Sequence, residues 1–243
     1  MEPDEIPFVT ADQMREVDRA MIEEYEIDLA QMMELAGRQL AALSRSEYLE
    51  GDPTDRSVLV LAGTGGNGGG GMVAARRLHG WGAEVELRTT RGRGEYEGVS
   101  GRQLRSLDRI GVPIMEEHEG LPTAEEDEYD LVVDAVVGYG LTGAPYGAAG
   151  RLVRWANRSS APTLSLDIPS GIEATEGHVL APAVEADATM TLALPKTGLR
   201  AEEARSHVGA LFLADIGVPP ELYREGPLAL QIAPVFTTSD LRR

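Results

Sequence analysis

The sequence has no cysteine, and several other features are absent or scarce in its 243 residues. Without cysteine, the chain can form neither disulfide bonds nor a thiolate nucleophile. No apolar run reaches the about 18 residues of a membrane-spanning helix. The acidic start, Met-Glu-Pro-Asp-Glu, lacks the basic and apolar regions of a signal peptide. We therefore expect a cytoplasmic protein that makes no contact with a membrane.

Basic residues are also scarce, and lysine almost absent. Asp and Glu total 40 against 22 Lys and Arg, a formal net charge of −18. Such a surface repels nucleic acid over most of its extent. The one lysine is Lys196, so 21 of the 22 basic residues are arginine. An acidic surface nearly free of lysine suits a protein that stays soluble in very high salt, and it suggests a chemical task for Lys196. The alternative is an ordinary acidic protein with a chance deficit of lysine.

Apolar strands alternate with helical segments along the whole chain. Two capping boxes, Thr10 with Gln13 and Asp28 with Gln31, predict two helices at the N-terminus. Strands are predicted at residues 57–62, 84–89, 113–115, 129–137, 162–168, 188–194 and 210–213, and helical patterns at 72–79, 103–110 and 152–156. Residues 117–128 are acidic and predicted to be a solvated surface segment. The pattern predicts one α/β domain over residues 1–243, with a mostly parallel sheet covered on both faces.

Residues 63–71 form a glycine-rich segment between the first predicted strand and the next helix. They read Gly-Thr-Gly-Gly-Asn-Gly-Gly-Gly-Gly, so seven of the nine are glycine. Glycine permits positive φ angles and lets a bulky ligand approach the main chain. The helix start offers free N–H groups, which favours an anion such as a phosphate. The alternative is a flexible turn without a ligand.

Polar residues that could carry chemistry lie at or just after three later strands. They are Asp134, Asp167, Ser170 and Lys196. In an open parallel sheet, ligands bind beyond the carboxyl ends of the strands, so these residues are expected to share one site. A structural role remains open for each: Asp134 could be buried on backbone N–H groups, and Asp167 or Ser170 could hold a turn. The four histidines share no metal-ligand spacing.

Six ordered motifs resemble the NAD(P)H-hydrate epimerase family, also called the YjeF N-terminal domain family. They are Met33-Glu-Leu-Ala-Gly37, the segment 63–71 with Val73-Ala-Ala-Arg76, Val133-Asp-Ala-Val-Val-Gly-Tyr-Gly140, Leu166-Asp-Ile-Pro-Ser-Gly171, Pro195-Lys-Thr-Gly198 and Val208-Gly-Ala-Leu-Phe-Leu-Ala-Asp-Ile-Gly217. The resemblance covers roughly residues 9–223. It implies a Rossmann-like three-layer α/β/α sandwich, a homodimer, and an isomerase that interconverts the R and S forms of hydrated NADH and NADPH. A separate dehydratase would then restore the S form.

The resemblance also implies roles for individual residues. Substrate contacts are implied for Gly66, Asn67, Gly68, Gly69, Gly70, Gly138, Tyr139, Gly140, Leu141, Thr142, Gly143, Ala144 and Asp167. A potassium ion, the one cofactor implied, would be held by Asn67, Asp134 and Ser170. Oxygen ligands from separate strand ends suit such a hard cation. For catalysis we expect Asp167 to do the acid–base work, with Lys196 as electrostatic support.

The chain departs from the family pattern at three positions. The family's Gly-x-Gly-Asn-Asn-Gly-Gly-Asp-Gly has lost an Asn at Gly66 and an Asp at Gly70, and Leu35 replaces another Asn. A nucleotide-binding or scaffold module with weakened catalysis is therefore the alternative function. A third reading is a dehydrogenase, because the spacing from Gly63 to Gly68 fits the dinucleotide fingerprint. However, Thr89-Thr90-Arg91 stands where that fingerprint places an acid.

The charge pattern yields a prediction about salt. Excess carboxylates repel one another when unscreened, and the salt-adapted interpretation predicts stabilisation beyond the range where ordinary Debye screening saturates. We expect the melting temperature to keep rising with potassium chloride into the molar range. Differential scanning calorimetry over a salt series measures this, and a melting temperature that stays constant from low to molar salt would contradict the salt-adapted interpretation.

Overall fold

The computed structural model describes residues 6–116, 129–226, 228–232 and 234–243. Its centre is an eight-stranded sheet in the order β3-β2-β1-β4-β5-β6-β7-β8. Every neighbouring pair is parallel except β7 with β8, which is antiparallel. The strands are β1 Ser57–Ala62, β2 Glu84–Thr89, β3 Ile114–Glu116, β4 Leu131–Ala135, β5 Thr163–Leu166, β6 Ala188–Leu192, β7 Ala210–Ala214 and β8 Leu241–Arg242.

Helices precede the sheet and connect its strands. The α-helices are α1 Ala11–Glu23, α2 Leu29–Glu47, α3 Gly66–Gly80, α4 Gly98–Arg109, α5 Gly147–Ala156, α6 Arg205–Val208 and α7 Pro220–Glu225. Short 3-10 helices, η1 Arg93–Glu95 and η3 Thr197–Arg200, lie in loops. Within the described residues, no helix combines the length and apolarity needed to cross a bilayer.

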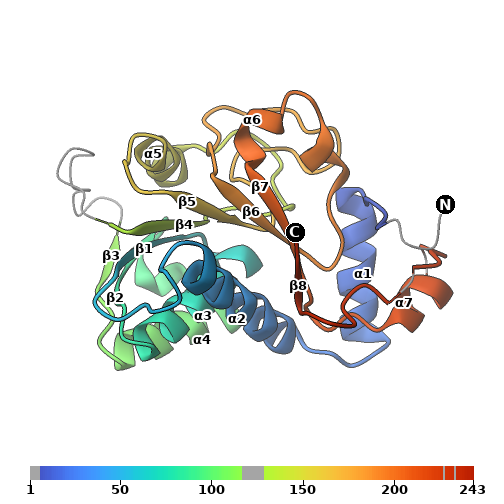
Figure 1. Cartoon of the computed structure of the whole chain (residues 1–243), viewed down its shortest axis with the longest axis horizontal. Helices are drawn as coiled ribbons and strands as arrows, with labels where there is room; N and C mark the ends of the chain where they lie inside the picture. Colours follow the sequence, from blue (N-terminus) through green and yellow to red (C-terminus); the bar gives the residue numbers. More distant parts are fainter. Residues whose placement is uncertain (1–5, 117–128, 227, 233) are drawn as a thin grey trace.

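The sheet is the middle layer of three, and both of its faces are buried. Helices α2, α3 and α4 lie on one side, and α5 and α6 on the other (Figure 1). Strand β1 illustrates the consequence: Val58 and Val60 pack in the core shared with α2, α3 and α4, whereas Leu59 and Leu61 pack in the core shared with α5. Burial on both faces explains the continuous apolar runs in the sequence and confirms the expected three-layer α/β fold.

Most predicted elements are confirmed, with differences at their ends. The strands predicted at 57–62 and 84–89 have those bounds, and both N-terminal capping boxes are formed. Strand β4 is shorter than the predicted 129–137, because the chain beyond Ala135 leaves the sheet to line a cavity. The sequence reading missed α6, α7 and β8, which are short or carry little apolar periodicity. The acidic segment 117–128 lies outside the described residues.

The glycine-rich segment corrects the predicted start of α3. The helix begins at Gly66 rather than at residue 72, and none of the glycines in 63–71, all of them described, has a positive φ. Close packing explains them instead. A Cβ atom on Gly68 would lie 1.8 Å from the Gly63 carbonyl oxygen, and one on Gly71 would lie 2.5 Å from Ala135 Cβ. Gly65 and Gly66 are different, since a Cβ there would meet nothing within 4 Å.

The N-terminal segment is tied to the far half of the sheet. The Val9 N–H donates to the Pro195 carbonyl at 2.9 Å, and the Thr197 N–H donates to the Val9 carbonyl at 2.8 Å. The Ala11 N–H also donates to Thr175 Oγ1 at 3.1 Å. These bonds fix the start of α1 beside Lys196, so this helix forms a wall of the molecule's cavity rather than an appendage.

The sheet has its topological switch point between β1 and β4. The connection from β1 to β2 passes through α3 on one face, whereas that from β4 to β5 passes through α5 on the other face. Ligands of doubly wound sheets bind in the crevice that this reversal leaves at the carboxyl ends of the strands.

The contact between α2 and α3 yields a prediction about stability. A Cβ on Gly37 would lie 2.4 Å from Val73 Cβ and 2.5 Å from the Gly70 carbonyl oxygen. Gly37→Ala must push these backbones apart, and overpacking of this kind costs about 1–3 kcal/mol of unfolding free energy. Gly80→Ala, at a position where a Cβ meets nothing within 4 Å, is the matched control. Urea denaturation measures both, and equal stabilities would contradict the packing argument.

Candidate active site

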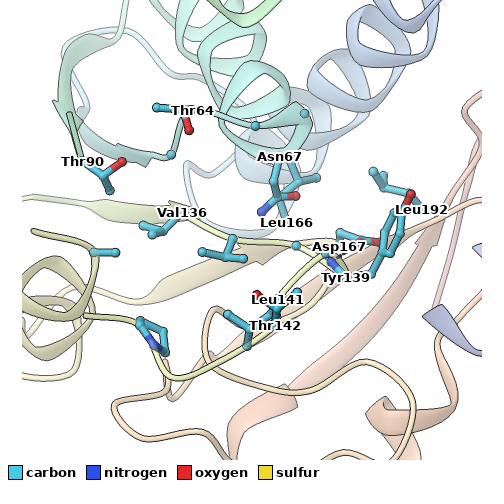
Figure 2. Close-up of a pocket in the computed structure, with 18 of the residues that line it drawn as sticks. Thr64, Asn67, Thr90, Val136, Tyr139, Leu141, Thr142, Leu166, Asp167 and Leu192 are labelled. Atoms are coloured by element: carbon cyan, nitrogen blue, oxygen red, sulfur yellow. Dashed lines mark hydrogen bonds between the residues drawn. The ribbon is translucent and has the colours of Figure 1, made fainter. Parts of the chain in front are cut away.

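A cavity of about 840 Å³ lies at the switch point. It extends over the carboxyl ends of five adjacent strands, β2, β1, β4, β5 and β6, and α1 closes one side. Figure 2 shows Thr64 and Thr90 at one end and Tyr139, Asp167 and Leu192 at the other. Since strands lie about 4.8 Å apart, the four spacings from β2 to β6 give a span of about 19 Å. That span suits an extended dinucleotide better than a mononucleotide.

Most residues named for substrate contact line this cavity. They are Gly66, Asn67, Gly138, Tyr139, Gly140, Leu141, Thr142, Gly143, Ala144 and Asp167. Gly68, Gly69 and Gly70 do not line it. Cβ atoms at these three positions would meet Gly63, Met33 and Leu166. These three glycines therefore allow α3 to pack closely, and they offer a ligand main-chain groups alone.

The start of α3 presents N–H groups to the cavity at Gly66 and Asn67, and these have no hydrogen-bond partner in the part of the chain that the structure describes. The first intrahelical bond runs from the Gly69 N–H to the Gly65 carbonyl at 3.0 Å. The amides of residues 66–68 thus precede the hydrogen-bonded part of the helix. Gly65 and Gly66 leave open space above these amides, because a side chain there would have no neighbour. Free amides and the positive end of the helix dipole suit a phosphate or diphosphate.

An ion pair forms the end of the cavity that lies beyond the carboxyl ends of β5 and β6. Lys196 Nζ contacts Asp167 Oδ1, and it donates to the Leu192 carbonyl at 2.9 Å. Both side chains are almost fully buried, with 1 % exposure at Lys196 and 4 % at Asp167. An unpaired charge at this depth would be strongly destabilising. The single lysine of the chain is therefore part of the cavity wall, and its ammonium holds the Asp167 carboxylate in place.

Asp167 has an uncommon backbone conformation. Its φ is +69°, in the left-handed region that non-glycine residues seldom occupy. The Asp167 N–H donates to the Met190 carbonyl at 2.7 Å, and Oδ2 accepts the Tyr139 N–H at 3.2 Å. These bonds, with Lys196, hold the residue in its strained conformation. Such strain is common where a side chain must be aimed at a ligand.

Asp18 is a cavity residue that the sequence reading missed. It lies on α1 and accepts a hydrogen bond from the Tyr139 hydroxyl, whose ring is 5.8 Å from Lys196 Nζ. Burial raises the pKa of Asp18, while the Tyr139 hydrogen bond and Lys196 partly offset the rise. Burial, together with Asp18, also raises the pKa of the Tyr139 hydroxyl, which stays protonated. Asp18 lies four residues after Met14 and therefore on the same, inward face of α1. This spacing is the sequence signal that could have identified it.

Asp134 and Ser170 lie behind the cavity wall rather than on it. Ser170 Oγ donates to Asp134 Oδ1 at 2.6 Å, the Ser170 N–H donates to Oδ2 at 2.9 Å, and Ser165 Oγ donates to Oδ2 at 2.8 Å. Asp134 is fully buried, and desolvation raises its pKa despite these donors. The cluster is hydrogen-bonded as a structural network, and its oxygens also suit a cation.

Asn67 has an unsatisfied group at this site. Its Nδ2 atom is buried and has no hydrogen-bond partner among the described residues. Its Oδ1 lies within 3.0 Å of where a Gly138 side chain would begin. The nitrogen and oxygen of an asparagine amide exchange places when the group is rotated by half a turn. A rotated Asn67 would place its oxygen where the unpartnered Nδ2 lies. An oxygen with no donor near it is a suitable ligand for a cation.

The three departures from the family pattern have different surroundings. Gly66 faces the cavity, where a longer side chain would have room. A Cβ on Gly70 would lie 2.9 Å from Leu166 Cδ2, so this position faces the sheet. Leu35 Cδ1 lies 3.1 Å from where a Gly217 side chain would begin, within an apolar cluster. Of the three, only Gly66 lines the cavity directly.

The sequence reading missed part of the cavity wall. These residues are Met14, Arg15, Asp18, Leu29, Met32, Met33, Ala36, Thr64, Pro145, Tyr146 and Ile216. Most come from α1, α2 and the segment before α5. Met33, Ala36, Thr64 and Ile216 belong to motifs of the family resemblance, but no role in the site was expected for them. The packing of the N-terminal helices against the strand ends brings these residues to the cavity.

Fold and site define a Rossmann-like α/β protein with a dinucleotide-length cavity at its switch point. Residues 29–198 match the model of the family described as YjeF-related protein N-terminus. The chain belongs to this family.

Relatives cover nearly the whole chain. An NAD(P)H-hydrate epimerase of Dehalogenimonas lykanthroporepellens is 42 % identical over 90 % of this chain and 86 % of its own length. A bifunctional NAD(P)H-hydrate repair enzyme, Nnr, of Salinibacter ruber is 38 % identical over 88 % of this chain, which spans 41 % of that enzyme. The crystal structure of yeast ynu0 (YNL200c) covers 98 % of this chain and 100 % of its own, with a TM-score of 0.80. At 22 % identity, that likeness shows the shared fold.

Proposed function

We propose that this protein is an NAD(P)H-hydrate epimerase, an isomerase that interconverts the R and S forms of hydrated NADH and NADPH. The observation that carries the proposal is the buried Asp167–Lys196 pair at one end of a dinucleotide-length cavity. Relatives named as epimerases match over nearly the whole chain. The amides at the start of α3 would bind the diphosphate, and the hydrated ring would lie beside Asp167.

The chemistry needs proton transfer at one oxygen. The ring nitrogen's electron pair assists as the carbon–oxygen bond breaks, and the leaving hydroxyl takes a proton and departs as water. Water then adds to the other face of the same carbon and gives up a proton, so no net oxidation or reduction occurs. The buried Asp167–Lys196 pair supplies the proton to the leaving hydroxyl, and the Asp167 carboxylate recovers one from the water that adds. Lys196 and the Tyr139 N–H hold its carboxylate in position.

Replacing Asp167 tests this assignment. Asp167→Asn keeps the shape but cannot exchange a proton as a carboxylate does, so turnover should fall about 10²- to 10⁴-fold. The assay supplies R-NADPHX in concentrated potassium chloride with an S-specific dehydratase and follows the appearance of NADPH. Asp108→Asn, on the outer face of α4, is the matched control. If Asp167→Asn ran at the native rate, Asp167 would not be the acid–base group.

The alternative, a binding or scaffold module, rests on Gly66 and Gly70. These positions lack two polar groups of the family pattern, while the cavity is retained. Such a protein would bind the dinucleotide without epimerising it. The same assay together with a binding measurement separates the two functions. Reduction of a carbonyl substrate by NADPH would instead support a dehydrogenase.

We also propose a potassium site formed by Asn67, Asp134 and Ser170. The fully buried carboxylate, the Ser170 hydroxyl and the unpartnered Asn67 amide supply oxygen chemistry of the kind that a hard monovalent cation prefers. A bound potassium ion would neutralise Asp134 and add positive charge beside the cavity. Among the described residues, no cluster of three His, Cys, Asp or Glu could hold a metal, so the proposed set depends on neutral oxygen ligands.

Potassium titration tests this site. In a background of N-methylglucamine chloride, added potassium should raise the melting temperature of the native protein. The response should be weaker in Asp134→Ala, which removes the full negative charge. Asn67→Ala leaves the buried Asp134 network intact, and its melting temperature should also rise less with added potassium. This variant tests the site if Asp134→Ala does not fold. Unchanged titration curves in the variants would remove these residues from the ion site.

The remaining partners follow from the proposed reaction. The Salinibacter ruber relative is a bifunctional repair enzyme of more than twice this length, and we infer that a dehydratase acts on the product of this chain. The expected homodimer stays a prediction from the family resemblance.

A further inference from the structure

Arg91 stands at the end of the cavity opposite the Asp167–Lys196 pair. It is the second residue after β2 and lines the cavity beside Thr90. Its side chain is 56 % exposed, and its ion pair with Glu95 is at the limit of contact, with 4.0 Å between the charged atoms. Glu95 does not line the cavity. The guanidinium is therefore available to an anion entering from the cavity.

The backbone that carries Arg91 is firmly held. The Thr90 N–H donates to the Ala62 carbonyl at 3.2 Å and to the Tyr96 hydroxyl at 3.2 Å. The Tyr96 hydroxyl itself donates to the Ala62 carbonyl at 2.8 Å. These bonds tie the end of β2 to the last residue of β1, immediately before the glycine-rich segment. The backbone at Arg91 is thus held close to the segment that leads into α3.

The order of sites along the cavity sets the direction of a bound dinucleotide. The acid–base pair follows β5 and β6, the amides that suit a diphosphate follow β1, and Arg91 follows β2. With the reacting ring at Asp167 and the diphosphate at α3, the adenosine must lie toward β2. In dinucleotide-binding folds, an acid at the end of β2 takes the ribose 2′-hydroxyl, whereas an arginine nearby accommodates a 2′-phosphate.

We propose that Arg91 forms a subsite for the 2′-phosphate of the adenosine, which makes hydrated NADPH the preferred substrate over hydrated NADH. The inference rests on the proposed function for the identity of the reacting ring. Its binding part does not depend on turnover, because the phosphate lies at the far end of the molecule from the chemistry. A guanidinium can bond a phosphate through two parallel N–H groups, which gives both affinity and orientation.

Two substitutions at Arg91 test the subsite. Arg91→Ala should lower kcat/KM for R-NADPHX about tenfold and leave that for R-NADHX within about twofold. Arg91→Glu should reverse the preference, since its carboxylate repels a phosphate and can accept a 2′-hydroxyl. Arg102→Ala, which removes an exposed arginine of α4 outside the cavity, is the control and should change neither value. The measurements use the lowest salt at which the protein stays folded, because screening weakens the contact.

Binding of NADP⁺ and NAD⁺, measured by calorimetry, separates this inference from the proposed function. A loss of affinity for NADP⁺ but not NAD⁺ in Arg91→Ala supports the subsite even if the chain lacks epimerase activity. Native epimerase activity with an unchanged ratio of the two substrates in both Arg91 variants overturns the subsite and leaves the proposed function intact. Equal losses for both dinucleotides would also overturn it, because the contact would then not be with the 2′-phosphate.

Discussion

The close packing of α3 on the sheet and on α2 is the constraint on which the rest of the structure depends. Main chain meets main chain here: side chains at Gly37 and Gly68 would collide with backbone atoms, and one at Gly71 with Ala135 Cβ. This approach brings the first amides of α3 to the switch point between β1 and β4. Gly65 and Gly66, which precede the closely packed glycines, leave the N-terminus of the helix open to a phosphate.

A second set of contacts joins the N-terminal helix to the opposite end of the cavity. The Val9 bridge places α1 beside Lys196, and Asp18 then meets the hydroxyl of Tyr139. Tyr139 links this contact to Asp167 through its N–H. Four charged or polar groups are thus linked in a chain of contacts. They come from α1, the segment after β4, and the ends of β5 and β6. The position of the Asp167 carboxylate depends on elements that are far apart in the sequence.

The departures from the family pattern change the cavity less than the sequence alone indicates. Leu35 belongs to an apolar cluster, and Gly70 faces Leu166 rather than open space. Only Gly66 removes a side chain from a position that faces the cavity. The Asp167–Lys196 pair, which the proposed chemistry uses, is complete. This arrangement is consistent with the family membership that the comparisons establish.

The sequence by itself determined the α/β class, the two capped N-terminal helices, the bounds of β1 and β2, and the family. Local signals suffice for these, because continuous apolar runs, capping residues and ordered motifs act over a few residues. It also placed Asp134, Asp167, Ser170 and Lys196 at strand ends. Tertiary structure decided which of them meet: Lys196 pairs with Asp167, whereas Asp134 and Ser170 form a separate buried cluster. It also decided that most glycines of 63–71 serve packing, that Gly65 and Gly66 leave open space, and that Asp18 lines the cavity. The physical reason is that side-chain partners and close backbone approaches are set by packing between distant segments, and no local pattern records them.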